Sequence, residues 1–412
     1  MTTEVAPEPQ ISEIQPAVVP ARIVSVDAYR GFVMLLMASS GLGIAEFVRE
    51  HHLNSAVWQF LAYQTDHVEW RGCALWDLIQ PSFTFIVGVA LPFSLAKRRS
   101  QGQSFAWMTF HAIVRSVILI SLGIFLRSIG RPLTYFTFED TLTQIGLGYT
   151  FVFLLAWTRP RVQAMAVMLI LVTYWLAFAF YPAPGPGFDS AVVGVPPDWH
   201  HLTGFAAHWD KNTNLAAAFD RWFLNLFPRQ HRFEYNGGGY LTLSFVPTLG
   251  TMILGLLAGE LLRSRQPSGK KFLALAAAGF VGLIIGTVLD LTGVCPIVKR
   301  IWTPSWTIFS AGWCCLLLAG FYAIIDLGRW KWWAFPMVVV GMNSIAMYCM
   351  ADGGFKGLVE SSFHTHLNRW HVFEKLLGPY HFYAPIAESA AALLVLWLVC
   401  LWMYRRKIFL RI

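Results

Sequence analysis

Charged side chains are scarce in this sequence, and they are scarce along most of its length. Only 13% of the 412 residues are Asp, Glu, Lys or Arg, whereas 56% are hydrophobic, and the mean hydropathy is +0.52. A soluble domain usually carries about 25% charged residues. The deficit argues against a soluble enzyme with a single anchor and indicates an integral membrane protein.

Paired cysteines are also missing. The six cysteines are scattered and form no CxxC pair and no zinc-like spacing, so we expect no metal site. Most of them fall within apolar runs, where cysteine behaves as a small apolar residue. Cys73 and Cys295 fall on the side expected to face away from the cytoplasm, where a disulfide between them is an alternative to two free thiols.

The N-terminus lacks the basic stretch of a signal peptide. Residues 1–21 are instead rich in proline, and they predict a disordered cytoplasmic tail. The remainder, 22–412, has only short breaks between its apolar runs. It therefore predicts one membrane domain without a separate soluble domain.

Ten apolar runs approach the length of about 20 residues that a helix needs to cross the hydrocarbon core. They lack strand-like alternation, so we predict an all-α polytopic bundle of about ten transmembrane helices and not a β-barrel. The runs are 29–48, 76–96, 110–127, 141–157, 164–181, 243–263, 272–290, 304–325, 336–351 and 385–404.

Every second break between these runs is basic and nearly free of acidic residues. Because Lys and Arg gather on the cytoplasmic side of membrane proteins, both termini are predicted to be cytoplasmic. This bias accounts for most of the net charge of +8, so we expect the lipid bilayer and not nucleic acid as its partner. The basic breaks are 97–99, 159–161, 263–271, 328–331 and 405–411.

The longest break, 182–240, would face the opposite side. A loop of this length is usually functional or disordered, and its Trp and His residues argue against disorder. We expect a short amphipathic helix at about 214–227. Its apolar face would comprise Leu215, Phe219, Trp222, Phe223 and Leu226.

The stretch TDHVEWRGCALWDLIQPSFTFIVG, residues 65–88, sets His67 and Asp77 ahead of an apolar run. One interpretation of Asp77 is an N-terminal cap, because a carboxylate satisfies free N–H groups and the helix dipole there. The other is a partner for His67, since a carboxylate beside an imidazole fixes the tautomer that a general base needs. Asp66 and Glu69 compete for that role, and their spacing does not rank them.

Further polar residues lie within or beside the apolar runs. Insertion of a charged side chain into the centre of a membrane costs roughly 2.5–3.5 kcal/mol. Gln144 and Arg115 are two of them. Asn343 and Ser344 either hydrogen-bond between helices or line a cavity. Lys299 is interpreted as a side chain that snorkels toward the headgroups.

Six segments of the chain carry a resemblance to a known family. In order, they are RIVSVDAYRGFVMLLM, HVEWRGCALWDLIQPSFTFIVG, LTQIGLGY, PTLGTMILGLLAGELL, KRIWTPSWTIFSAG and VVGMNSIAMY. Together they resemble the heparan-alpha-glucosaminide N-acetyltransferase family and its bacterial relatives, from Arg22 through the ninth apolar run. The outer loop 182–240 looks peculiar to this chain.

The resemblance implies a transmembrane acetyltransferase. Such a protein takes acetyl groups from cytoplasmic acetyl-CoA and delivers them to an amino or hydroxyl group of a sugar on the far side of the membrane. The catalytic histidine of the family and its aspartate fall on His67 and Asp77. His67 would act either as a general base for direct transfer or as a nucleophile that forms an acetyl-imidazole.

The resemblance also places Asn343 and Ser344 near the site, and Trp70 and Gln144 join them as candidates for oxyanion or substrate binding. The phosphates of the donor would meet basic groups at the cytoplasmic mouth. The candidates there are Arg30, Arg98 and Arg115.

Two further expectations concern the setting of the protein. The relatives point to a bacterial inner (cytoplasmic) membrane, and family members pair as dimers, so a homodimer is expected. The competing function is a membrane transporter or flippase for a glycan-related solute, in which embedded polar residues line a path. Binding of CoA thioesters would separate the two functions.

Overall fold

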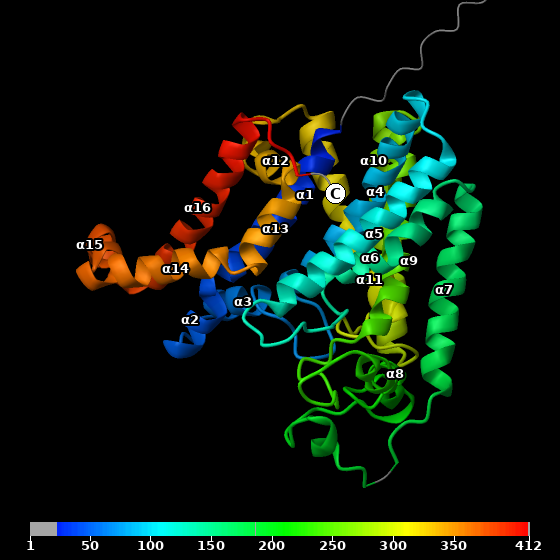
Figure 1. The fold of residues 1–412 in the computed structure, drawn as a ribbon, viewed down its shortest axis with the longest axis horizontal. Coiled ribbons are helices and arrows are strands. Elements are labelled where there is room, and N and C mark those ends of the chain that lie inside the picture. The colour runs from blue at the N-terminus through cyan, green and yellow to red at the C-terminus, as the bar shows by residue number, and fades with distance from the viewer. Residues whose placement is uncertain (1–22, 186, 411–412) are drawn as a thin grey trace, which may run out of the picture.

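The described part of the chain folds mainly into helices (Figure 1). The computed structural model describes residues 23–185 and 187–410, so the predicted tail at 1–21 lies outside the described residues. Within those ranges the β pairing is a single isolated bridge between Arg71 and Val298. The predicted all-α polytopic bundle is thereby confirmed.

Eight helical segments of the described chain are long and apolar enough to cross a membrane. The long helices that form them are α1 (Val24–Ser39, continued by α2, Ile44–Glu50), α4 (Ile79–Ser100), α5 (Phe105–Ser128), α7 (Pro160–Phe180), α9 (Phe245–Arg263), α10 (Ser268–Leu291), α11 (Pro304–Phe321) and α16 (Ala384–Arg405).

The other two predicted runs differ from straight spans. The run predicted at 141–157 is α6 (Thr141–Leu155), a shorter apolar helix. The run predicted at 336–351 is a pair, α12 (Phe335–Met342) and α13 (Ser344–Asp352), bent by 71°. The break falls at Asn343, which has non-helical backbone angles and a side chain that bonds elsewhere in the chain. An amide side chain competes in this way with the helix backbone.

Small residues allow the central helices to approach closely. A Cβ on Gly255 of α9 would lie 2.0 Å from the carbonyl oxygen of Phe85 on α4, and one on Gly341 of α12 would lie 2.0 Å from that of Asp27 on α1. Close backbone approach at small residues is a main source of helix association within membranes. These contacts fix α4 against α9 and α1 against α12.

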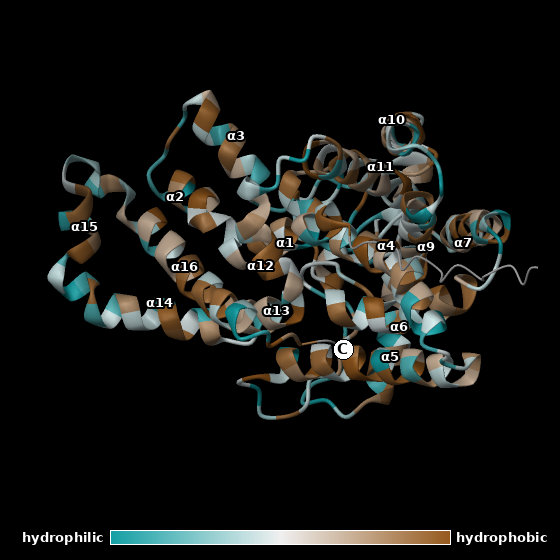
Figure 2. Cartoon of the chain, turned by 90° about the horizontal axis from the view of Figure 1, so that it is seen from above, coloured by the Kyte–Doolittle hydropathy of each residue, from teal (hydrophilic) through white to brown (hydrophobic). Residues whose placement is uncertain are grey.

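The helices form a bundle whose outer surface is largely apolar. In Figures 1 and 2, α7 lies at one side of the bundle, and α14 (Phe355–His366), α15 (Val372–Leu377) and α16 lie at the other. The helices α5, α7 and α10 carry exposed large apolar side chains, such as Val117, Leu169 and Ile284. This pattern is that of an integral multi-pass membrane protein.

The predicted outer loop folds into a small domain at the lower end of Figure 1. We call it the α8-end domain, and the end of the molecule where it lies the α8 end. It contains the 3₁₀ turns η3 (Ser190–Val193) and η4 (Gly204–Trp209), and the helix α8 (Leu215–Phe223). Its buried Trp199 and Trp209 belong to an apolar cluster that it shares with Tyr174 of α7 and with Trp70, which precedes α4.

The helix expected at 214–227 is confirmed as α8 with the 3₁₀ turn η5 (Leu224–Leu226), and the residues of its expected apolar face differ in burial. The buried residues are Ala216, Ala217 and Asp220, whereas Trp222 and Leu226 are exposed. Leu215, Phe219 and Phe223 are half-buried, so the expected apolar face lies partly against the fold and is partly exposed.

Candidate functional site

His67 and Asp77 meet at the start of α4. The His67 Nδ1 atom lies 2.8 Å from Oδ1 of Asp77. Asp77 belongs to the 3₁₀ turn η2 (Leu75–Leu78) that leads into α4, and its side chain is only 1% exposed. Its Oδ2 atom accepts hydrogen bonds from the backbone N–H groups of Ala74, at 3.0 Å, and Val68, at 3.3 Å. One carboxylate thus serves as a local backbone cap and as the imidazole partner, so the two interpretations of Asp77 are not alternatives.

The two competing carboxylates have other surroundings. Asp66 pairs with Arg49 at 2.7 Å and accepts a hydrogen bond from the backbone N–H of His67, but it does not bond the ring. Glu69 is exposed and lines the outer cleft described below. Asp77 is therefore the partner that the fold selects.

Lys299 completes this cluster, contrary to its predicted position at the headgroups. Its side chain is 5% exposed, and its Nζ atom lies 3.3 Å from Oδ1 of Asp77 and 3.1 Å from Nδ1 of His67. Snorkelling is therefore the wrong interpretation. The sequence signal for this placement was the position of Lys299 in a short segment between two prolines. These are Pro296 and Pro304, and α11 begins at Pro304.

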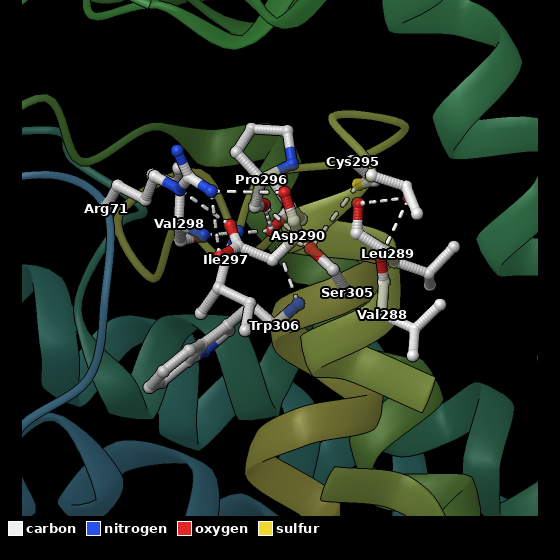
Figure 3. A network of polar contacts seen from close by, with 12 residues as sticks. Arg71, Val288, Leu289, Asp290, Cys295, Pro296, Ile297, Val298, Ser305 and Trp306 are labelled. Atoms are coloured by element: carbon white, nitrogen blue, oxygen red, sulfur yellow. Dashed lines mark hydrogen bonds and ion pairs between the residues drawn. The ribbon is translucent and has the colours of Figure 1, made fainter. Parts of the chain in front are cut away.

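A network of polar contacts around Asp290 holds the segment that leads to Lys299, and Figure 3 shows this network. Arg71 forms a two-point ion pair with Asp290, at 2.8 and 3.0 Å, and the same carboxylate accepts the backbone N–H of Ile297. The Arg71–Val298 bridge and the hydrogen bond from the backbone N–H of Gly72 to the carbonyl of Ile297 join the two segments further. Two-point pairs of this kind add orientation as well as energy, so the segment after α10 is held against the segment that carries His67.

The surroundings keep the imidazole of His67 neutral. Burial lowers the pKa of His67, the charges of Lys299 and Arg300 also lower it, and the hydrogen bond to Asp77 opposes them. With the Nδ1–H directed at Asp77, the Nε2 atom has a lone pair that can accept a proton. Burial raises the pKa of the neighbouring Cys73 thiol, so this cysteine is not a competing nucleophile near neutral pH.

The His67 side chain is reachable from outside, since 36% of it is exposed. It lines a cavity of about 640 Å³, which we call the outer cleft. The outer cleft is lined by Ala45, Val48, Arg49, His52, Asn54, Gln59, Ala62, Tyr63, Asp66, His67, Val68, Glu69 and Arg71.

The three arginines singled out in the sequence line one cavity of about 400 Å³, which we call the arginine cavity. It follows one face of α4 from Phe83 to Arg98, about 22 Å along the helix axis. Arg115 donates to the hydroxyl of Tyr149 at 3.2 Å, and Arg30 lies 3.5 Å from Asp27. The lining is Asp27, Arg30, Phe83, Val87, Ala90, Leu91, Ser94, Arg98, Arg115, Leu119, Leu142, Ile145, Tyr149, Gly341, Met342, Ser344, Ile345 and Leu410.

Asn343 and Ser344 belong to the surroundings of the arginine cavity. Ser344 lines it. The Asn343 amide donates to the carbonyl of Ile408 at 3.1 Å and accepts from the backbone N–H of Leu410 at 3.2 Å. Its two polar ends therefore hold the C-terminal segment, which also lines the cavity, and are not directed at His67.

Trp70 and Gln144 hold other parts of the fold together. The Trp70 indole is buried and donates to the carbonyl of Trp209 at 3.1 Å, so it anchors the α8-end domain. The Gln144 amide donates to the carbonyls of Phe138 and Thr242, at 2.7 and 3.2 Å. Neither side chain presents its donor to the outer cleft.

The described residues contain no cluster of three His, Cys, Asp or Glu side chains placed to hold a metal ion. All six cysteines lie within those residues and are free, so the disulfide alternative for Cys73 and Cys295 is wrong. The two thiols instead lie near separate partners, the carbonyl of Ala74 and the hydroxyl of Ser305.

The fold and the site together define a polytopic membrane protein with a histidine–aspartate–lysine cluster at one end of its bundle. No family model matches the chain. The chain is similar to the heparan-alpha-glucosaminide N-acetyltransferase of Homo sapiens, with 23% identity over 452 residues, which cover 98% of this chain and 63% of the relative. The corresponding protein of Mus musculus is 23% identical over 437 residues, covering 95% and 60%. The chain thus spans about three-fifths of the length of these relatives, and the resemblance inferred from its motifs is confirmed.

Proposed function

We propose that this protein is a membrane-bound acyltransferase that moves an acetyl group from acetyl-CoA to an amino or hydroxyl group of a sugar on the opposite side of the membrane. The observation that carries the proposal is the course of α4. The arginine cavity follows this helix from Phe83 to Arg98, near its C-terminal end, and Asp77 stands just before its N-terminal end. Arg98 follows Asp77 by 21 positions, which correspond to about 32 Å of helix, roughly the thickness of a hydrocarbon core.

The donor would enter at the arginine cavity, whose end of the bundle carries the basic breaks and is assigned to the cytoplasm. Arg30, Arg98 and Arg115 come from three different helices, so they can surround a phosphate group from several directions. Guanidinium groups suit phosphate oxygens in charge and geometry. The slender pantetheine arm would then extend along α4 toward His67.

The acceptor would bind in the outer cleft, where the exposed edge of His67 faces solvent. The Nε2 atom takes the proton of the attacking amine or hydroxyl, and Asp77 holds the ring in the required tautomer. Lys299 balances the charge of Asp77 and disfavours the imidazolium before the acceptor arrives. Direct transfer requires only this base; the acetyl-imidazole route would use the same Nε2 atom as the nucleophile.

The test uses the full chain in proteoliposomes, with labelled acetyl-CoA on one side and an amino sugar, such as glucosamine, trapped on the other. We expect labelled acetyl-sugar in the trapped compartment. A second arm omits the sugar and denatures the protein after a single turnover. Label retained on His67 would support the acetyl-imidazole route, and absence of label would support direct transfer. No product with any amino or neutral sugar, from a protein that remains folded, would contradict the proposed activity.

One observation favours the alternative of a transporter or flippase: α12 and α13 are the broken helix pair that transporters often place at a substrate site. The two functions make different demands on CoA. A transporter for another solute would show no saturable binding of acetyl-CoA to the purified protein. The acyltransferase should bind it, and the binding should weaken in Arg98→Ala.

A further inference from the structure

The α8-end domain contains a second histidine–carboxylate pair, distinct from the His67 cluster. The His201 Nδ1 atom lies 2.5 Å from Oδ2 of Asp210, and the His201 Nε2 atom on the other side of the ring lies 3.3 Å from Oγ of Ser190. A hydroxyl, an imidazole and a carboxylate therefore contact one another in succession. The order of the three groups is that of a serine nucleophile, its general base and the group that orients the base.

The carboxylate of Asp210 is firmly placed. Its side chain is only 4% exposed. Its Oδ1 atom accepts hydrogen bonds from the backbone N–H of Lys211, at 2.9 Å, and from the indole of Trp199, at 3.4 Å. Because a carboxylate only accepts, the Nδ1 atom of His201 must carry the proton in this contact, and Nε2 has the free lone pair. The fold thereby selects the tautomer in which His201 accepts the proton of Ser190.

The turn that carries Ser190 is fixed to the same framework. Ser190 opens the 3₁₀ turn η3, which Asp189 caps by accepting the backbone N–H of Ala191 at 3.0 Å. The side chain of Asn212, two residues after Asp210, donates to the carbonyl of Val193 at the end of that turn, at 2.9 Å. The nucleophile and the orienting carboxylate are thus held by one short stretch of chain.

Solvent reaches the imidazole and the hydroxyl, which would contact a substrate, but not the carboxylate. The His201 side chain is 41% exposed and Ser190 is half-buried, whereas the carboxylate behind them is buried. Ligand-free serine–histidine distances are often longer than those in a substrate complex, and 3.3 Å lies within that range. A purely structural cross-link would not need the hydroxyl on the exposed side of the ring.

We propose that Ser190, His201 and Asp210 form a second catalytic site, one that hydrolyses short-chain acyl esters at the α8 end. The Oγ atom of Ser190 bonds to the ester carbonyl carbon while its proton moves to Nε2 of His201. The C–O bond to the alcohol then breaks, and the alcohol leaves with that proton. Water attacks the acyl-serine with the same proton transfers in turn, which gives the acid and restores Ser190. Esters fit this site better than amides, because an alkoxide is an easier leaving group than an amine anion.

The test treats the full-length protein in detergent with a fluorophosphonate probe and locates the adduct by mass spectrometry. We expect modification of Ser190, together with hydrolysis of p-nitrophenyl acetate. Both should be lost in Ser190→Ala and should fall by about 100-fold in His201→Gln. His200→Gln is the matched control, since His200 is the exposed neighbour in the same loop, and it should keep both activities.

The proposal is overturned if Ser190 remains unmodified under conditions that label another serine hydrolase in the same detergent, or if His201→Gln reacts as fast as the unaltered chain. Thermal melting and size-exclusion profiles check that the variants fold. If His201→Gln does not fold, Ser190→Ala decides through ester hydrolysis, because loss of one hydroxyl leaves the histidine–aspartate contact in place. His67→Ala should retain the labelling of Ser190, so failure here and failure of the proposed acetyl transfer are separate results.

Discussion

Two histidine–aspartate pairs among the described residues share one geometry and differ in the third group. In both, the Nδ1 atom faces a nearly buried carboxylate, Asp77 for His67 and Asp210 for His201. The third group is the ammonium of Lys299 in the first pair and the hydroxyl of Ser190 in the second. The position of that group relative to the ring therefore decides what each imidazole can do.

Lys299 lies on the Nδ1 side, beside the contact between the ring and the carboxylate, so it leaves Nε2 open to a substrate that brings its own nucleophile. Ser190 lies on the Nε2 side, so it occupies the place where such a nucleophile would bind. The first arrangement suits transfer to an external acceptor and the second suits a covalent acyl-serine. The predictions below test whether this distinction holds.

The largest effect is expected from His67→Ala, which should reduce acetyl transfer by about 10²–10⁴-fold because the base is removed while the cleft remains. The measurement is initial-rate acetyl transfer in proteoliposomes, normalised to folded protein. The control is His364→Ala, an exposed histidine on α14 that contacts neither pair, and it should transfer at the rate of the unaltered chain. Equal rates for the two variants would remove His67 from the mechanism.

Asp77→Asn should be almost as severe, with a loss of about 10²–10⁴-fold in kcat, because an amide NH₂ would favour the tautomer with its proton on Nε2. The substitution also removes an acceptor from the backbone N–H of Ala74 or Val68. Thermal melting must therefore accompany the kinetics. A variant that is as stable and as active as the unaltered chain would show that Asp77 is a cap only.

The comparison also marks how far the sequence leads. His67 and Asp77 were predicted because a carboxylate stands at a helix entrance near a histidine, and because the family resemblance selected Asp77 over Asp66 and Glu69. Lys299 was misplaced because its contact depends on tertiary pairing: only the Arg71–Asp290 ion pair and the Arg71–Val298 bridge bring its segment to the site. The position of Lys299 between Pro296 and Pro304 is a local signal, but it does not indicate which distant segment the lysine will meet.

Ser190, His201 and Asp210 were missed for a related reason. They are spaced by eleven and nine residues in an irregular loop, where no helical or strand period relates side-chain directions. The run containing Asn343 was predicted as one helix because its hydropathy is continuous, yet the amide bonds to a segment 65 residues away. Hydropathy located the helices well, and it could not anticipate polar contacts made between distant segments.

Substitution of an arginine that lines the arginine cavity should affect donor binding more than the rate of acetyl transfer. Arg98→Ala should raise KM for acetyl-CoA by about 10–100-fold with a smaller change in kcat, as expected for the loss of a charge-assisted hydrogen bond. The same substitution should leave ester hydrolysis at Ser190 unaffected. A matched loss in kcat at saturating donor would place Arg98 in the transfer step and not in binding.

Lys299→Met should change the pH dependence of transfer. The Lys299 charge contributes to the lowered pKa of His67, so its removal raises that pKa and protonates the base at higher pH. The acid limb of the kcat/KM profile should therefore move to higher pH, and activity at pH 6 should fall more than activity at pH 8. A parallel loss at every pH would indicate a structural role for Lys299 instead.

The smallest effect concerns Asp220, a buried carboxylate of the α8-end domain that has no histidine partner among its hydrogen bonds. It accepts the backbone N–H of Thr242 at 3.0 Å, and burial raises its pKa to about 7. Because the folded-state pKa is higher than that of an unfolded aspartate, near 3.9, the protonated form stabilises the fold. That stabilisation is complete below about pH 4 and is lost as the pH rises toward 7, at about 1.4 kcal/mol per pH unit within that window.

Asp220→Asn keeps an acceptor for Thr242 but cannot ionise, so it should melt at a higher temperature than the unaltered chain at pH 8, with a smaller difference at pH 5. The measurement is thermal unfolding of the full chain in one detergent at the two pH values. Asp189→Asn is the control, since that carboxylate is exposed and caps the turn of Ser190. An increase in melting temperature at pH 5 as large as that at pH 8 would mean that ionisation of Asp220 does not destabilise the fold. In that case a buried carboxylate in this domain would need no basic partner such as His201.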